Sequence, residues 1–140
     1  MDKLKVTNDY VFKRIFAKQG NEKILKDLLI SILEIPIKEI EVIHDSQLER
    51  TIKDNKVGIL DIKAILNNNI TINIEMQVKD QSNMVDRSLF YWSNLYSNGL
   101  YKKEDYTQNN KTIVINILEF NIFKDGPYHE KCMIRRDYNC

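Results

Sequence analysis

Two acidic residues, Asp61 and Glu75, lie on either side of a run of three asparagines and are the residues best placed to do chemistry. The flanking stretches, GILDIKAIL at 58–66 and ITINIEMQVK at 70–79, are rich in β-branched residues and predict a β-hairpin within 56–79. Side chains alternate between the two faces of a strand. Asp61 therefore shares a face with Lys63, and Glu75 shares a face with Gln77.

The length of the turn decides whether the two carboxylates meet. If residues 67–69 form a three-residue loop, Asp61 falls directly opposite Glu75. A two-residue loop would place Asp61 opposite Met76, because a slip of one residue turns every side chain to the other face. A three-residue loop needs a residue in the left-handed region, which asparagine tolerates well. We therefore expect the three-residue loop.

Two like charges at directly opposed positions of a hairpin repel each other, because their Cβ atoms are roughly 4.5–5.5 Å apart. A divalent cation between Asp61 and Glu75 would convert this repulsion into binding, since hard cations prefer carboxylate oxygens. The hairpin therefore predicts a metal site.

The bulk composition is that of one globular domain. The chain has 140 residues, 43% hydrophobic and 29% charged. A net charge of +1 neither requires nor excludes a nucleic-acid partner. The first residues, MDKLKVTNDY, lack an apolar signal core, and no apolar run is long enough to cross a membrane. We expect a cytoplasmic protein with free thiols at Cys132 and Cys140.

Hydrophobic periodicity predicts an α/β fold around the hairpin. The segment 121–140 is interpreted as a C-terminal extension of the domain formed by 1–120, a loop with one short edge strand. We expect the strand after the long helix to be buried and parallel to an earlier strand. The expected elements are helices at about 8–18 and 21–35, a strand at 37–47, the hairpin strands, a helix from 80 or 82 to about 103 and a strand at 112–120.

The long helix begins just after the second hairpin strand, so its first turns should lie over the strand ends. Arg87 and Tyr91 are four residues apart and share one side of it. From there, Arg87 could reach a phosphate near the metal; alternatively, it is a solvated arginine beside a packed tyrosine. The predicted core face of this helix consists of Met84, Val85, Leu89, Trp92, Leu95, Tyr96 and Leu100.

Four words of the sequence carry a resemblance to a known family: TNDYVFKRIF at 7–16, GILDIKA at 58–64, NIEMQV at 73–78 and RSLFYWSNLYSNGLY at 87–101. Together with the element order αα-β-β-β-α-β, they resemble the PD-(D/E)xK nuclease superfamily, and more narrowly the Rpn family of recombination-promoting nucleases, also described as transposases. The resemblance covers roughly 7–120. It implies a restriction-endonuclease-like core, a mixed central sheet flanked by helices.

The resemblance implies a magnesium-dependent endonuclease that hydrolyses phosphodiester bonds in DNA and promotes recombination or DNA degradation. Asp61 and Glu75 would hold Mg²⁺, joined by the backbone carbonyl of Met76. Magnesium keeps several waters and shares its ligands with substrate phosphate, so two carboxylates suffice. Arg87 and Tyr91 are the expected nucleic-acid-binding residues, and Asp9 is carried over as an accessory acidic residue.

One position departs from the superfamily pattern. Gln77 occupies the place of the usual lysine, and its amide can orient a water but can neither carry charge nor act as a base. Lys63 and Lys79 could each supply the missing cation. Lys63 is favoured, because it is diagonal to Glu75 in the expected register and diagonal neighbours stay within reach of long side chains. The expected catalytic residues are therefore Asp61, Glu75, Gln77 and Lys63.

Two alternatives stay open beside the endonuclease. One is a cleavage-deficient or truncated module of the same fold that binds DNA or assembles with other molecules, and the other is different phosphodiesterase chemistry such as RNA cleavage. The family resemblance also leads us to expect a chain longer than 140 residues. We therefore interpret the present chain as a shortened form or a fragment. A homodimer is expected, because cutting both strands usually requires two sites.

Overall fold

The computed structural model of the protein describes residues 5, 7–43, 61–80, 82–101 and 111–135, with the backbone alone for 98–101. The element order matches the expected αα-β-β-β-α-β. The elements are α1 (Asp9–Phe16), α2 (Glu22–Leu33), β1 (Ile40–Val42), β2 (Ile62–Leu66), β3 (Ile70–Gln77), α4 (Met84–Tyr101) and β4 (Lys111–Leu118).

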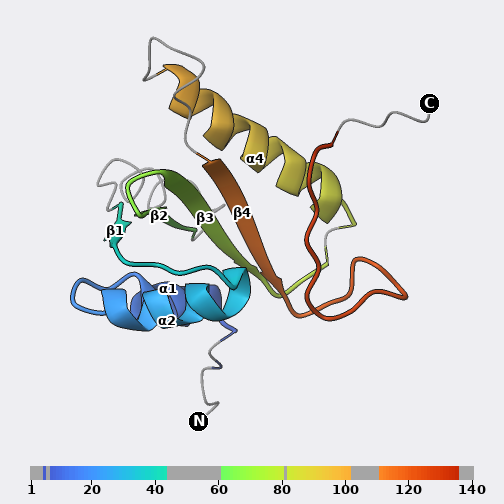
Figure 1. The fold of residues 1–140 in the computed structure, drawn as a ribbon. Coiled ribbons are helices and arrows are strands. Elements are labelled where there is room, and N and C mark those ends of the chain that lie inside the picture. The colour runs from blue at the N-terminus through green and yellow to red at the C-terminus, as the bar shows by residue number, and fades with distance from the viewer. Residues whose placement is uncertain (1–4, 6, 44–60, 81, 102–110, 136–140) are drawn as a thin grey trace, which may run out of the picture.

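The strands form a mixed sheet in the order β1-β2-β3-β4. β2 is antiparallel to β1 and to β3, whereas β4 is parallel to β3. The parallel pairing confirms one part of the expectation for the strand that follows the long helix. The expectation that this strand is buried was wrong, because β4 lies at the edge of the described sheet and only Ile115 in it is buried. Helices α1 and α2 lie on one side of the sheet and α4 lies on the other (Figure 1). The arrangement is a three-layer α/β fold.

The hairpin has the register that a three-residue loop requires. Leu66 pairs with Ile70, and Ile62 pairs with Ile74. Within the loop, Asn67 and Asn68 adopt left-handed backbone conformations, with φ of 48° and 60°. The expected loop length is therefore confirmed, and the tolerance of asparagine for positive φ is its local cause.

Asn67 also ties the hairpin to the segment before β1. Its Oδ1 accepts hydrogen bonds from the backbone N–H of Lys38 at 2.8 Å and of Glu39 at 3.2 Å. Its Nδ2 donates to the carbonyl of Pro36 at 3.1 Å. One turn residue thus fixes both the loop conformation and the approach of the chain to the sheet edge.

The apolar core lies between the sheet and the layer of α1 and α2. Alternate residues of β2 and β3 point into it, as the strand period requires. Its buried members are Phe12, Leu25, Leu29, Ile37, Ile62, Ala64, Leu66, Ile72, Ile74, Met76 and Ile115. The opposite face of β3 carries polar residues instead. Asn73 and Glu75 are nevertheless only 4% and 3% exposed there.

The two N-terminal helices begin in different ways. Asn8 caps α1, because its Oδ1 accepts from the N–H of Val11 at 3.2 Å. Asn21 occupies the N-cap position of α2 but makes no side-chain capping bond there. Its Nδ2 donates instead to the carbonyl of Ile15 at 2.6 Å. This bond ties the start of α2 to the end of α1.

Two expected extents differ from the structure. The first strand was expected at 37–47, but in its described part, up to residue 43, the strand comprises only Ile40–Val42. Residues 44–60, including the start of the expected hairpin, lie outside the described residues. In the segment 121–135 there is no helix or strand, so the described part of the C-terminal extension is a loop without the edge strand. Cys132 is a free, exposed thiol, as expected, and Cys140 lies outside the described part.

The predicted core face of α4 was wrong at three positions. Val85, Leu89 and Tyr96 are 53%, 55% and 37% exposed, whereas Met84 is buried. The side turned to the sheet includes Arg87 and Ser88, which bond to polar residues of β3 and β4. The surface under α4 is polar, so the helix is rotated to present its polar residues there and leaves part of its apolar stripe outside. Among the helices described, none has the length and apolar character that a membrane crossing requires.

Candidate functional site

The hairpin brings Asp61 and Glu75 to neighbouring positions. Asp61 directly precedes β2, and continuing the register by one residue from the Ile62–Ile74 pair places it opposite Glu75. Glu75 is buried and Asp61 is half-buried. The predicted register therefore holds at the site, while the role of the two carboxylates as metal ligands stays a prediction.

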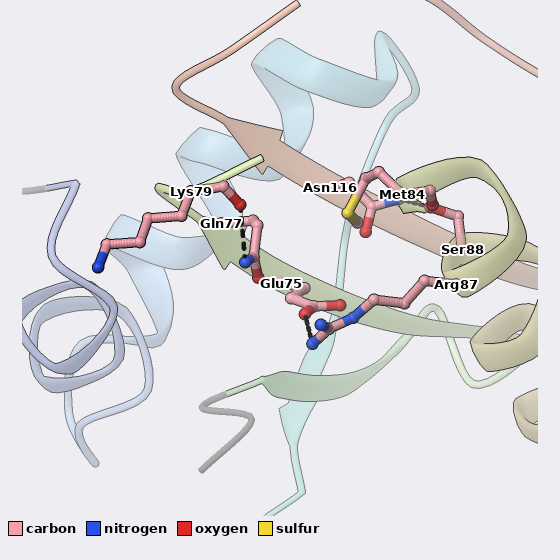
Figure 2. Close-up of polar contacts among 7 residues, drawn as sticks. All are labelled: Glu75, Gln77, Lys79, Met84, Arg87, Ser88 and Asn116. Carbon is pink, nitrogen blue, oxygen red and sulfur yellow. Dashed lines mark hydrogen bonds and ion pairs between the residues drawn. The ribbon is translucent and has the colours of Figure 1, made fainter. Parts of the chain in front are cut away.

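Helix α4 supplies a counter-ion to one of these carboxylates. The guanidinium Nη2 of Arg87 donates to Oε1 of Glu75 at 2.6 Å, forming a largely buried ion pair (Figure 2). The guanidinium carbon also lies 5.5 Å from the centre of the Tyr91 ring. The structure brings Arg87 and Tyr91 together, as their spacing predicts. It turns the arginine toward Glu75, and binding of nucleic acid by either residue stays a prediction.

Both carboxyl groups lie in surroundings that disfavour their negative charge. Burial raises the pKa of Glu75; Arg87 lowers it in part, and the charge of Asp61 raises it further. Burial also raises the pKa of Asp61, with partial compensation from Lys63 and Lys13. For both groups the net shift of the pKa is upward. An added cation would relieve this electrostatic cost.

Three buried oxygen atoms on the α4 side of the sheet accept no hydrogen bond from the described residues: Oε2 of Glu75, Oδ1 of Asn73 and Oδ1 of Asn116. Carboxylate and amide oxygens are the ligands that hard divalent cations prefer. The donor set therefore fits a magnesium-like ion. In the described part of the chain there is no cluster of three or more His, Cys, Asp or Glu side chains that could hold a metal. Amide or backbone oxygens and water would have to complete the coordination.

The two candidate lysines are placed differently. Nζ of Lys63 lies 4.0 Å from Oδ2 of Asp61. Lys79 is exposed, and its side chain extends away from Glu75 (Figure 2). Gln77 donates from Nε2 to the Lys79 carbonyl at 3.1 Å. Lys63 therefore lies beside Asp61 and Lys79 does not, while a catalytic role for either lysine stays a prediction.

Met76 buries its side chain in the core, on the face opposite to Glu75. Only its backbone carbonyl therefore fits the ligand role that the family resemblance implies. Asp9 accepts a hydrogen bond from the N–H of Tyr10 at 2.8 Å, and in the described structure it does not bond to Asp61 or Glu75. Its accessory role stays a prediction.

Two residues near the site were missed as specific candidates. Lys13, one helical turn beyond Asp9, is close enough to lower the pKa of Asp61. Asn116 on β4 pairs with Glu75 and donates from Nδ2 to Oγ of Ser88 at 2.8 Å. A single polar residue inside the apolar run IVINIL at 113–118 was the available signal for Asn116. Lys13 lies in the word TNDYVFKRIF and is one of several basic residues that could contact nucleic acid, but nothing in the sequence linked it to Asp61.

The mixed sheet, the helices on both of its faces and the acidic pair on its central hairpin define an α/β protein with a restriction-endonuclease-like core. A family model described as PD-(D/E)XK nuclease family transposase matches residues 6–138. The chain belongs to this family. Searches of curated proteins and of solved structures each found no significant match.

Proposed function

We propose that this protein is a divalent-metal-dependent endonuclease that hydrolyses phosphodiester bonds in DNA, with Mg²⁺ as the natural ion. One observation carries the proposal: at the position opposite Asp61, Oε2 of the buried Glu75 has no hydrogen-bond partner among the described residues. A buried acceptor without a partner is destabilising unless a ligand satisfies it. Membership of a nuclease family supports the same chemistry.

Asp61, Glu75 and the backbone carbonyl of Met76 would hold the ion. When bound, a divalent ion lowers the pKa of a coordinated water and polarises the scissile phosphate. Lys63, beside Asp61, places a positive charge at the edge of this site, where it can stabilise negative charge that develops on the phosphate. Gln77 can orient a water through its amide but cannot take up a proton. In this proposal two different residues therefore stabilise the charge and orient the water: Lys63 does the first and Gln77 the second.

A second candidate function keeps the fold without the reaction. The ion pair of Arg87 and Glu75 neutralises the central carboxylate without any metal. This observation favours a DNA-binding module that has lost cleavage. The two functions differ in whether a divalent ion can bind beside Arg87.

Incubation of supercoiled plasmid with the protein and Mg²⁺ tests the proposal directly. We expect nicking by the wild type and a loss of at least about a hundredfold in Asp61→Asn and Glu75→Gln. Asp27→Asn is the matched control, because it makes the same chemical change on an exposed face of α2. No nicking by the wild type, or equal nicking by Asp61→Asn, would overturn the proposal that the protein is an endonuclease. Retained plasmid binding without nicking would support the second candidate.

Three further parts of the proposal do not depend on the geometry of the site. The protein would act in the cytoplasm, promote recombination or DNA degradation, and cut both strands as a homodimer. Sedimentation at the concentration used for cleavage tests the last of these. A monomer that linearises plasmid in a single binding event would contradict the proposal that the protein acts as a homodimer.

A further inference from the structure

We propose that Asn116 on β4 is a third oxygen ligand of the metal site, presenting Oδ1 to the same hard divalent cation as Asp61 and Glu75. This inference rests on the proposed metal-dependent function and names an additional residue of that site. The parallel register pairs Asn116 with Glu75. Both side chains lie on the sheet face covered by α4, since each bonds to a residue of that helix.

Three residues that are far apart in the sequence thereby lie side by side in one row across the sheet. Asp61 lies opposite Glu75 in the continued antiparallel register, and Asn116 lies beside Glu75 in the parallel one. The row carries two carboxylates and one amide. Oδ1 of Asn116 and Oε2 of Glu75 are both buried without a hydrogen-bond partner in the described structure, and the Glu75 side chain is 3% exposed.

The orientation of the Asn116 amide follows from its neighbours. Oγ of Ser88 lies 2.7 Å from the carbonyl of Met84, to which it can only donate its hydrogen. The hydroxyl must therefore accept from Asn116, and the amide must turn its NH₂ group toward Ser88, as Figure 2 shows. Oδ1 is consequently left without this partner and is available to a cation. Ser88 acts as a positioning residue for Asn116.

A neutral amide is chemically suited to this place. The two carboxylates already supply the charge needed for a divalent ion, and Arg87 occupies the other oxygen of Glu75. An amide oxygen adds a hard ligand without adding further like charge to a site where burial already disfavours it. A purely structural role, in which Asn116 only links β4 to α4, would account for Nδ2 but would leave Oδ1 buried and unused.

Calorimetric titration of the metal-free protein with Mn²⁺, together with the Mn²⁺-induced shift in melting temperature, tests the inference without reference to cleavage. Asn116→Ala should weaken Mn²⁺ binding about tenfold. Asn116→Asp should tighten it and enlarge the thermal shift, because a carboxylate replaces the amide oxygen. Asn94→Asp, the same change at an exposed position of α4, should match the wild type.

Ser88→Ala keeps Asn116 and removes only the group that orients its amide, so we expect a severalfold weakening of Mn²⁺ binding. Ser88→Ala therefore tests the inference even if a variant at position 116 fails to fold. Wild-type binding that depends on Asp61 but is unchanged in Asn116→Ala, Asn116→Asp and Ser88→Ala would overturn the role of Asn116 alone. Absence of Mn²⁺ binding by the folded wild type would overturn this inference and the metal-dependent function together.

Discussion

Nη2 of Arg87 lies 2.6 Å from Oε1 of Glu75, and the side chains of the two residues are 20% and 3% exposed. The ion pair joins α4 to the central strand β3 and covers one oxygen of the carboxylate. The second oxygen, Oε2, has no hydrogen-bond partner among the described residues. The described residues therefore supply a partner to only one of the two carboxylate oxygens of Glu75, and the other oxygen can bind a ligand.

Arg87→Met should destabilise the fold, because it leaves the buried charge of Glu75 without its counter-ion. We expect a loss of about 2–3 kcal/mol in the free energy of unfolding, below the full value for a buried pair because Arg87 is partly exposed. The double variant Arg87→Met/Glu75→Gln should recover part of this loss. Urea denaturation measures both. Arg14→Met, at an exposed position of α1, is the control and should change the free energy by about 0.5 kcal/mol or less.

The stability of Asp61→Asn relative to the wild type should rise with pH when both are measured in EDTA. The pKa of Asp61 is raised in the folded protein by burial. Its charged form is therefore disfavoured by folding, and the wild type loses stability as the pH rises from about 4 through the raised pKa. The asparagine variant does not titrate and avoids this loss. Thermal unfolding across this pH range gives the difference, and a relative stability that falls with pH would contradict the upward shift.

Saturating Mg²⁺ should reverse the pH effect in the wild type. Binding requires both carboxylates in their charged form, so affinity should decline as the pH falls through their raised pKa values. At a free concentration about a hundred times Kd, the ion would add about 2.7 kcal/mol to the free energy of unfolding. Melting curves with Mg²⁺ and with EDTA, at a series of pH values, measure this gain. A gain that is the same at every pH would exclude the two carboxylates as ligands.

Lys63→Ala should reduce plasmid cleavage by about a hundredfold while leaving Mg²⁺ affinity nearly unchanged, because Lys63 lies 4.0 Å from Asp61 and would act on the phosphate. Lys79→Ala is the matched control, since Lys79 is exposed and extends away from Glu75 (Figure 2). Cleavage rates at saturating Mg²⁺ compare the two. Full cleavage by Lys63→Ala together with loss in Lys79→Ala would reverse the assignment.

Asn67→Ala should destabilise the hairpin by about 2–3 kcal/mol. The variant loses side-chain hydrogen bonds to Lys38, Glu39 and Pro36 and puts alanine at a φ of 48°. Asn67→Gly should lose less, because glycine tolerates positive φ. Chemical denaturation ranks the variants against Asn69→Ala, an exposed turn position without a positive φ. Equal effects at 67 and 69 would show that the turn does not hold the register.

The hairpin register and the order of the elements around the site could be predicted from the sequence. Strand alternation and the tolerance of asparagine for positive φ predicted the three-residue loop and, through it, the register that sets Asp61 against Glu75. The order of helices and strands was also predictable, because local periodicity is a property of neighbouring residues. Lys63 could be favoured over Lys79 because the same register places it diagonal to Glu75.

Only the tertiary structure decided which side of α4 faces the sheet. Periodicity predicted that Val85 and Leu89 would be buried, yet both are exposed while Arg87 contacts Glu75 and Ser88 contacts Asn116. A helix selects its buried face by the surface that it covers, and that surface is assembled from strands far apart in the chain. Glu75 and Asn116 are 41 positions apart in sequence and become neighbours only when β3 and β4 pair in parallel. The ion pair at Glu75 and the oxygen of Asn116 therefore follow from strand pairing and could not be predicted from local sequence.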